Sequence, residues 1–111
     1  MLKLAHVALA IAMGAGLAPA LATASTGAAA TVNPAGEKLY KSACVACHST
    51  GVANAPKLGN KAVWKPLIEA GMDSMMEIAI KGKGAMPPRG ASSADDDTLK
   101  AAVEYMVMKS Q

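Results

Sequence analysis

The chain has 111 residues, of which 52% are hydrophobic and 17% are charged, and its formal net charge at pH 7 is +3. This length allows one domain, and the apolar content excludes a chain that is disordered by composition. Removing residues 1–24 would remove one basic residue, Lys3, and no acidic one. The remaining charge of +2 gives no reason to expect a nucleic-acid partner.

The first 24 residues have the composition of a targeting segment. Lys3 gives a basic start, a mostly apolar run from Leu4 to Leu17 follows, and small residues continue up to Ala24. This order is typical of a secretory signal peptide. The apolar run is too short, and too interrupted by glycine, to span a membrane comfortably. We expect cleavage after Ala22 or Ala24 and export to the periplasm. The alternative is a retained leader, the one case in which we expect membrane association.

The next residues separate this segment from the folded part. Residues 25–33 are mostly small and predict a flexible linker, which leaves residues 34–111 as the folded domain. Asn33 suits an N-cap, and proline suits the first helical turn because its missing N–H is not needed there. A helix is therefore predicted from Pro34 to about Cys44. Glycine and proline in residues 49–59 then predict a loop.

Three further helices are predicted downstream. Asn60 caps one that runs to about Ala70, with Pro66 as a point where it bends or splits. Asp73 caps the next, which ends at Gly82, and Asp95 or Asp96 begins the last. The last helix has the clearest apolar periodicity of the chain, carried by Leu99, Ala102, Val103, Met106 and Val107. Strand-like alternation is absent from the sequence, so the expected fold class is all-α with four or five short helices.

The residues with the most specific chemistry are Cys44-Val45-Ala46-Cys47-His48. C-x-x-C-H is the attachment signature of c-type haem. Two thiols one helical turn apart can form thioethers with the two vinyl groups of one porphyrin, and the following imidazole can bind the iron. A covalent haem c would also supply bulk to a core that has one Trp, two Tyr and no Phe.

Three other uses of this cysteine pair fit less well. A thioredoxin-like redox pair accompanies alternating strands and helices, which are not predicted here. A zinc site requires four ligands, and beyond Cys44, Cys47 and His48 the processed chain offers only carboxylates. A structural disulfide between the two cysteines is possible, because export permits it.

The second axial ligand of the iron is predicted to be Met86. His48 is the only histidine outside the leader, which excludes ligation by two histidines. Five other methionines of the processed chain lie in predicted helices or beside them and are expected to fill the core. Met86 lies in Gly82-Lys83-Gly84-Ala85-Met86-Pro87-Pro88, where glycines allow close approach and prolines stiffen the loop. A thioether held there suits a haem iron and would leave no open coordination position.

Two further groups near the motif have predicted roles. The carbonyl of Pro56 is the candidate acceptor for the other ring nitrogen of His48, and Leu58 is expected to pack on the haem face. The alternative is that Pro56 is simply a turn residue.

Five basic residues cluster in the sequence around the two ligand loops. They form either a rim that steers an acidic partner or an ordinary solvated surface: Lys57, Lys61, Lys81, Lys83 and Arg89.

Five segments together resemble the bacterial cytochrome c5 family: 36–40, the haem motif, 55–59, 82–90 and 101–106. The resemblance implies the class I cytochrome c fold, with the first and last helices crossing beside one haem. It also implies His48 and Met86 as axial ligands, Pro56 as the acceptor of His48, and dimers in some members. Many members carry a second cysteine pair before the last helix, whereas this chain has Ala91-Ser92-Ser93-Ala94. We therefore expect this loop to be more loosely packed.

The predicted function is periplasmic transfer of single electrons between respiratory redox partners, such as terminal oxidases or reductases, by a monomer or weak dimer. A six-coordinate iron leaves no substrate site, so we expect no enzymatic activity. The alternative is a haem-bearing subunit of a larger oxidase or reductase complex. A c-type peroxidase or gas sensor would require an open coordination position on the iron.

Overall fold

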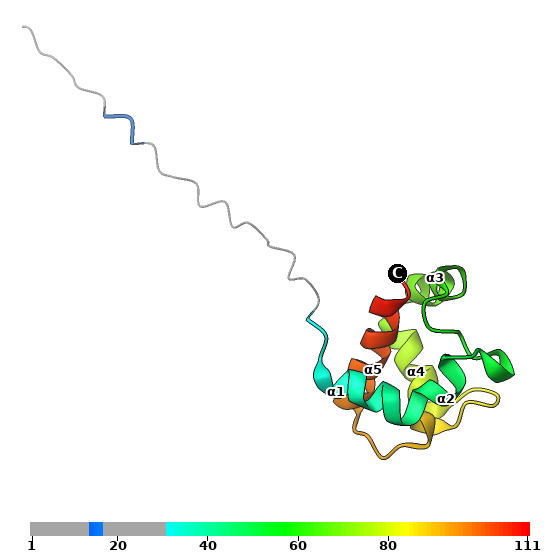
Figure 1. The fold of residues 1–111 in the computed structure, drawn as a ribbon. Coiled ribbons are helices and arrows are strands. Elements are labelled where there is room, and N and C mark those ends of the chain that lie inside the picture. Colours follow the sequence, from blue (N-terminus) through cyan, green and yellow to red (C-terminus); the bar gives the residue numbers. More distant parts are fainter. Residues whose placement is uncertain (1–13, 17–30) are drawn as a thin grey trace, which may run out of the picture.

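The computed structural model describes residues 14–16 and 31–111. All but three residues of the predicted signal peptide, and residues 25–30 of the predicted linker, lie outside the described part. The described chain is helical, which confirms the expected class (Figure 1). Its α-helices are α1 (Pro34–Leu39), α2 (Val45–His48), α3 (Lys61–Ala70), α4 (Met72–Lys81) and α5 (Asp96–Lys109). Shorter helical turns are η1 (Tyr40–Cys44), η2 (Val52–Asn54) and η3 (Pro88–Ala91).

The first helical segment begins as predicted but continues beyond Cys44. Asn33 caps α1, and its side chain accepts a hydrogen bond from the Ala35 amide. The five-residue turn η1 is π-helical, and α2 then extends to His48. Cys44 ends η1 and the other four motif residues form α2, so the whole haem motif lies on helical backbone. The segment ends where Gly51 adopts φ 77° and its amide binds the Cys47 carbonyl.

The two middle helices differ from prediction in detail. Pro66 lies inside α3 without splitting it. The cap of α3 is Asn60 as predicted, since its side chain accepts from the Val63 amide. In α4 the prediction of Asp73 as the cap is wrong: the helix begins at Met72 after Gly71, and Asp73 lies in its first turn. The carboxylate there still interacts favourably with the helix dipole.

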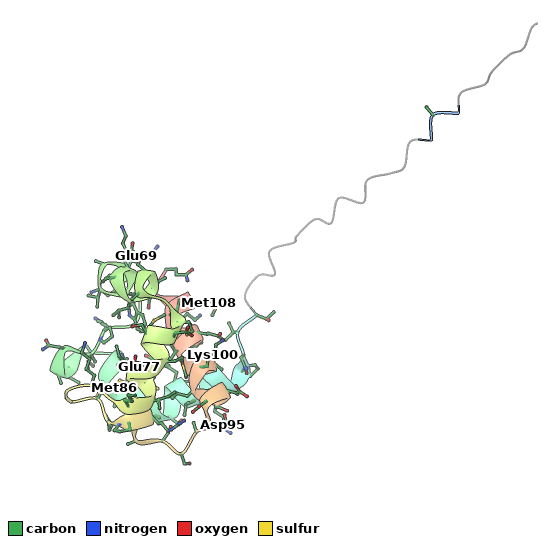
Figure 2. All side chains as sticks on the ribbon, turned by 180° about the vertical axis from the view of Figure 1, so that it is seen from behind. Glu69, Glu77, Met86, Asp95, Lys100 and Met108 are labelled. Carbon is green, nitrogen blue, oxygen red and sulfur yellow. The ribbon has the colours of Figure 1, made fainter. Side chains whose placement is uncertain are left out.

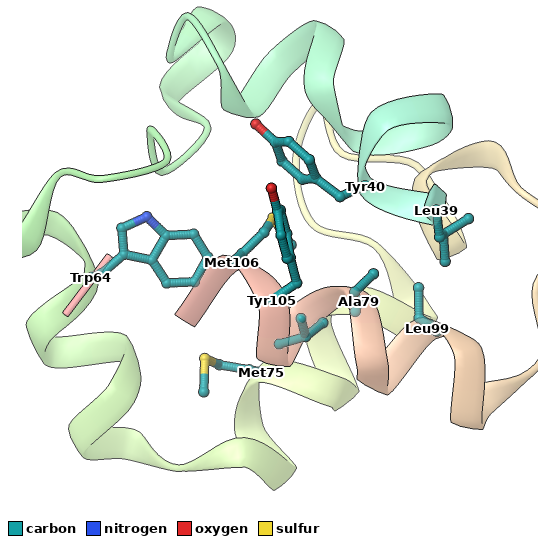
Figure 3. Close-up of a cluster of buried hydrophobic side chains, with 10 residues drawn as sticks. Leu39, Tyr40, Trp64, Met75, Ala79, Leu99, Tyr105 and Met106 are labelled. Atoms are coloured by element: carbon teal, nitrogen blue, oxygen red, sulfur yellow. The ribbon is translucent and has the colours of Figure 1, made fainter. Parts of the chain in front are cut away.

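The backbones of α1 and α5 approach closely where the two helices cross. A Cβ built on Gly36 would lie 2.2 Å from the Ala101 carbonyl oxygen, so only glycine permits this approach. One turn further on, the rings of Tyr40 and Tyr105 lie side by side with centroids 5.2 Å apart (Figure 3). This arrangement agrees with the crossing that the family resemblance implied. Burial raises the pKa of the Tyr40 phenol above its ordinary value.

The loop between α4 and α5 is fastened by Arg89. Its guanidinium donates to the Ala94 carbonyl at 3.0 Å and forms an ion pair with Asp96 at the start of α5. The hydroxyl of Ser92 donates to the Arg89 carbonyl at 2.7 Å. These bonds hold residues 89–96, the stretch that the sequence analysis expected to be more loosely packed.

Candidate haem-binding site

A cavity of about 620 Å³ lies between the helices and the two predicted ligand loops. Its wall is mainly apolar, and four of the predicted site side chains, Cys44, Cys47, His48 and Met86, line it together with Pro56. This volume is in the range of small-molecule and cofactor sites. A large flat apolar macrocycle with two thioether links fits this set of residues. Within the described residues, no group of three or more His, Cys, Asp or Glu side chains could hold a metal ion by itself.

His48 is buried and held by the loop that follows the motif. Its Nδ1 lies 2.9 Å from the Pro56 carbonyl oxygen, the acceptor that the sequence indicated. Its own carbonyl accepts from the Leu58 amide at 2.7 Å. With Nδ1 protonated and bonded to Pro56, Nε2 is the nitrogen that remains available to bind a metal.

Met86 lies on the loop that follows α4 (Figure 2). A tight turn presents it, because the Met86 amide donates to the Lys83 carbonyl and the Lys83 amide donates to the Met86 carbonyl, both at 3.0 Å. Gly82 is required beneath this turn: a Cβ there would lie 2.6 Å from the Met86 carbonyl oxygen. The glycine therefore allows the loop to cross over the end of α4.

The two cysteines differ in exposure. Cys44 is partly buried and Cys47 is exposed, so the cavity reaches the surface near Cys47. Burial raises the pKa of the Cys44 thiol, which favours its protonated form before a thioether is made.

Leu58 is not part of the cavity wall. Its side chain is partly buried against the hydrophobic core, and its contribution at the site is the backbone bond to His48.

Trp64 is a wall residue that the sequence did not identify. It lines the cavity and donates its indole Nε1–H to the Lys57 carbonyl at 2.9 Å. An apolar residue on the inward face of a predicted helix is the only sequence signal for this role. Other wall residues come from α4 and α5: Met75, Ile78, Ala79, Leu99, Ala102, Val103 and Met106.

The basic residues around the two loops divide into two groups. Lys81 is paired with Glu77 and Arg89 with Asp96. Lys57, Lys61 and Lys83 form no ion pair within the described residues, and Lys83 lines the cavity. The sequence had grouped all five residues, and three of them remain as exposed cations near the ligand loops.

Comparison with known proteins gives consistent matches. A family model described as cytochrome c oxidase, cbb3-type, subunit III matches residues 31–106. Cytochrome c-555 of Chlorobaculum tepidum is 42% identical over 82 residues, which cover 69% of this chain and 76% of that protein. Cytochrome c5 of Azotobacter vinelandii is 42% identical over 74 residues, covering 64% and 89%. The chain is a class I cytochrome c.

Solved structures of cytochromes agree with this assignment. A chain in the crystal structure of an electron transfer complex of nitrite reductase with cytochrome c is 57% identical, with a TM-score of 0.71, covering 72% of this chain and 99% of that one. A mono-haem ferrocytochrome c from Shewanella putrefaciens is 42% identical, with a TM-score of 0.60, covering 68% and 94%. The cytochrome thus carries covalent haem c and transfers electrons, as its sequence predicted.

Proposed function

We propose that this cytochrome is an exported, non-enzymatic carrier of single electrons whose haem iron is bound by His48 and Met86. The observation that carries the proposal is that these two side chains line one apolar cavity together with both cysteines of the motif. When bound, the haem supplies an iron that gains and loses one electron, and thioether ligation favours its ferrous state. The residues of the chain hold the ligands and exclude water.

The two ligand loops are built for fixed geometry. Pro56 orients the imidazole of His48 through its 2.9 Å contact with Nδ1, and the paired bonds between Lys83 and Met86 fix the loop that carries the thioether. A ligand set that hardly moves between redox states lowers the reorganisation that electron transfer requires. Because both axial positions would be filled, neither a peroxide nor a gas has an open site on the iron.

Export to the periplasm rests on the leader pattern in residues 1–24, which lies almost entirely outside the described residues. In the described part of the chain, no helix combines the length and apolar character needed to cross a membrane. The test is the N-terminal sequence of the protein recovered from a periplasmic fraction. Processing after Ala22 or Ala24 would support export, and an intact Met1 would support a retained anchor.

Respiratory reductases are the proposed class of electron acceptor. The solved complex between a nitrite reductase and a cytochrome c supports this choice, because its matching chain is 57% identical to this one. The exposed cations Lys57, Lys61 and Lys83 would favour an acidic surface on the partner. A monomer or weak dimer suits a shuttle that must leave one partner to reach the next.

A second candidate is a haem-bearing subunit of a terminal oxidase, which the description of the matching family model favours. Purification separates the two candidates. A shuttle is recovered from the soluble fraction as a separate chain that exchanges electrons in solution. A subunit is recovered with partner chains, and its haem is reduced only within that complex.

The ligand assignment is tested with two methionine variants. Met86→Ala should abolish the ferric methionine–iron charge-transfer band and allow carbon monoxide to bind the ferrous iron rapidly. Met76→Ala is the matched control, since Met76 is a partly buried methionine that packs against the core and does not line the cavity. Loss of the band in Met76→Ala but not Met86→Ala would refute the assignment, as would rapid carbon monoxide binding to the unaltered protein.

A further inference from the structure

Ser110, which follows α5, is the largest of the described side chains that are almost completely buried. Its relative exposure is 1%, although serine is usually found at the surface. Ser110 follows α5, and its amide donates to the Val107 carbonyl at 3.0 Å. Its hydroxyl oxygen accepts a hydrogen bond from the Gly59 amide at 2.9 Å, across 51 positions of the sequence.

Gly59 belongs to the loop that orients His48. Along this loop, the Pro56 carbonyl contacts His48 Nδ1, the Lys57 carbonyl accepts from Trp64, and the Leu58 amide donates to the His48 carbonyl. The bonds from Pro56 and Leu58 join the loop to His48 itself. They therefore cannot fix the loop and His48 relative to the rest of the protein. Trp64 bonds the loop to α3, Ser110 bonds it to the end of α5, and the Ala55 amide bonds it to Val52 of η2. Of these, the Ser110 bond is the one that joins the loop to a segment distant in the sequence.

We propose that Ser110 is a positioning residue for His48, acting through the Gly59 amide and the loop that ends at Pro56. The proposal rests on the proposed ligation of the iron by His48. The end of α5 lies beside α3 and the preceding loop, as the position of the C-terminus shows (Figure 1). The hydroxyl is used as a buried acceptor there, and losing it would leave the Gly59 amide without a partner.

The expected effect on the haem follows from the chemistry of the imidazole. A strong bond from Nδ1–H to a carbonyl raises the basicity of the metal-binding nitrogen, which stabilises the ferric state. If the loop relaxes, the contact between His48 and Pro56 lengthens and the ferric state is less stabilised. The reduction potential should therefore rise when the Ser110 hydroxyl is removed.

The test uses the holoprotein with Ser110→Ala and the conservative variant Ser110→Thr. In Ser110→Ala, we expect the Gly59 amide to exchange with solvent about fivefold faster. The nitrogen-bound proton resonance of His48 should shift, and the potential should rise. Ser110→Thr keeps the acceptor and should restore all three values toward those of the unaltered protein. Met108→Ala is the control, because it removes apolar contacts near the same helix end without touching Gly59.

Two results would overturn the proposal. One is a Ser110→Ala protein that is less stable but keeps the exchange rate, the His48 resonance and the potential of the unaltered protein. The other is a Gly59 amide that exchanges as fast as an unbonded amide in the unaltered protein, which needs no variant. A strongly shifted His48 resonance in the ferric unaltered protein separates both results from a failure of the His48 assignment, since only an imidazole bound to the paramagnetic iron shows such a shift.

Discussion

Replacing Gly36 with alanine should destabilise the crossing of α1 and α5. The new Cβ would lie 2.2 Å from the Ala101 carbonyl oxygen, 2.3 Å from its carbonyl carbon and 2.8 Å from the Ala102 nitrogen. All three atoms belong to the backbone, so no side-chain rotation can relieve the clash. A normal carbon–oxygen contact of about 3.3 Å requires the helices to separate by roughly 1 Å. Separation also loosens the packing of Tyr40 on Tyr105.

The size of the effect can be bounded from two opposing terms. Overpacking a close contact costs about 1–3 kcal/mol, while replacing glycine within a helix recovers at most about 1 kcal/mol. The two terms together leave a net loss of up to about 2–3 kcal/mol in the free energy of unfolding for Gly36→Ala, and separation of the tyrosine pair would add about 0.5–1.5 kcal/mol. The loss should appear as a lower guanidinium midpoint in the ferric protein, followed by circular dichroism.

A control on the same helix isolates the propensity term. Ala35 is exposed and adjacent to the crossing, so Ala35→Gly should cost about 1 kcal/mol or less with no change in packing. If Gly36→Ala unfolds at the same or a higher guanidinium concentration than the unaltered protein, the close contact of the two backbones is not a stabilising feature.

Three further predictions concern the site and its supports. Trp64→Phe should lower the free energy of unfolding by about 0.5–1.5 kcal/mol, because the Lys57 carbonyl loses the indole donor and keeps only the Asn60 amide; an unchanged denaturation midpoint would contradict this. The bond from a backbone amide lowers the pKa of Asp95, so its cap contributes stability above the unfolded pKa of about 3.9, and this contribution is lost as pH falls. Asparagine at position 95 can cap the helix but does not titrate, so the stability advantage of the unaltered protein over Asp95→Asn should shrink below about pH 4. A difference in stability that stays constant with pH would contradict the role of the Asp95 carboxylate as the cap. Lys83→Gln should slow association with a reductase by roughly a few-fold at low salt, whereas the paired Lys100→Gln should not, and equal effects would exclude a role for the rim.

Features carried by local sequence were predictable. The spacing of Cys44, Cys47 and His48 is a direct consequence of haem geometry, and the Met86 loop is marked by its glycines and prolines. Caps such as Asn33 and Asn60 were equally visible, because a capping side chain bonds to a backbone amide two or three residues away. These features require no knowledge of how distant segments pack.

Features that depend on distant contacts were not predictable. The bond between Gly59 and Ser110 joins positions 51 residues apart, and a serine near the end of a chain carries no signal for burial. The π-helical turn η1 escaped notice because apolar periodicity is read with the α-helical repeat. Arg89 was read as a surface charge, although it fastens the loop before α5.

Single-electron transfer by a haem iron with no open site is tested most directly by rapid mixing of the reduced, purified cytochrome with a nitrite reductase under anaerobic conditions. We expect loss of the ferrous spectrum with one electron transferred per haem, at a rate that depends on reductase concentration. We also expect hydrogen peroxide alone to oxidise the haem far more slowly. A haem that stays reduced in the presence of an active reductase, yet reacts rapidly with peroxide, would rule out electron transfer by a six-coordinate iron and indicate an open iron site.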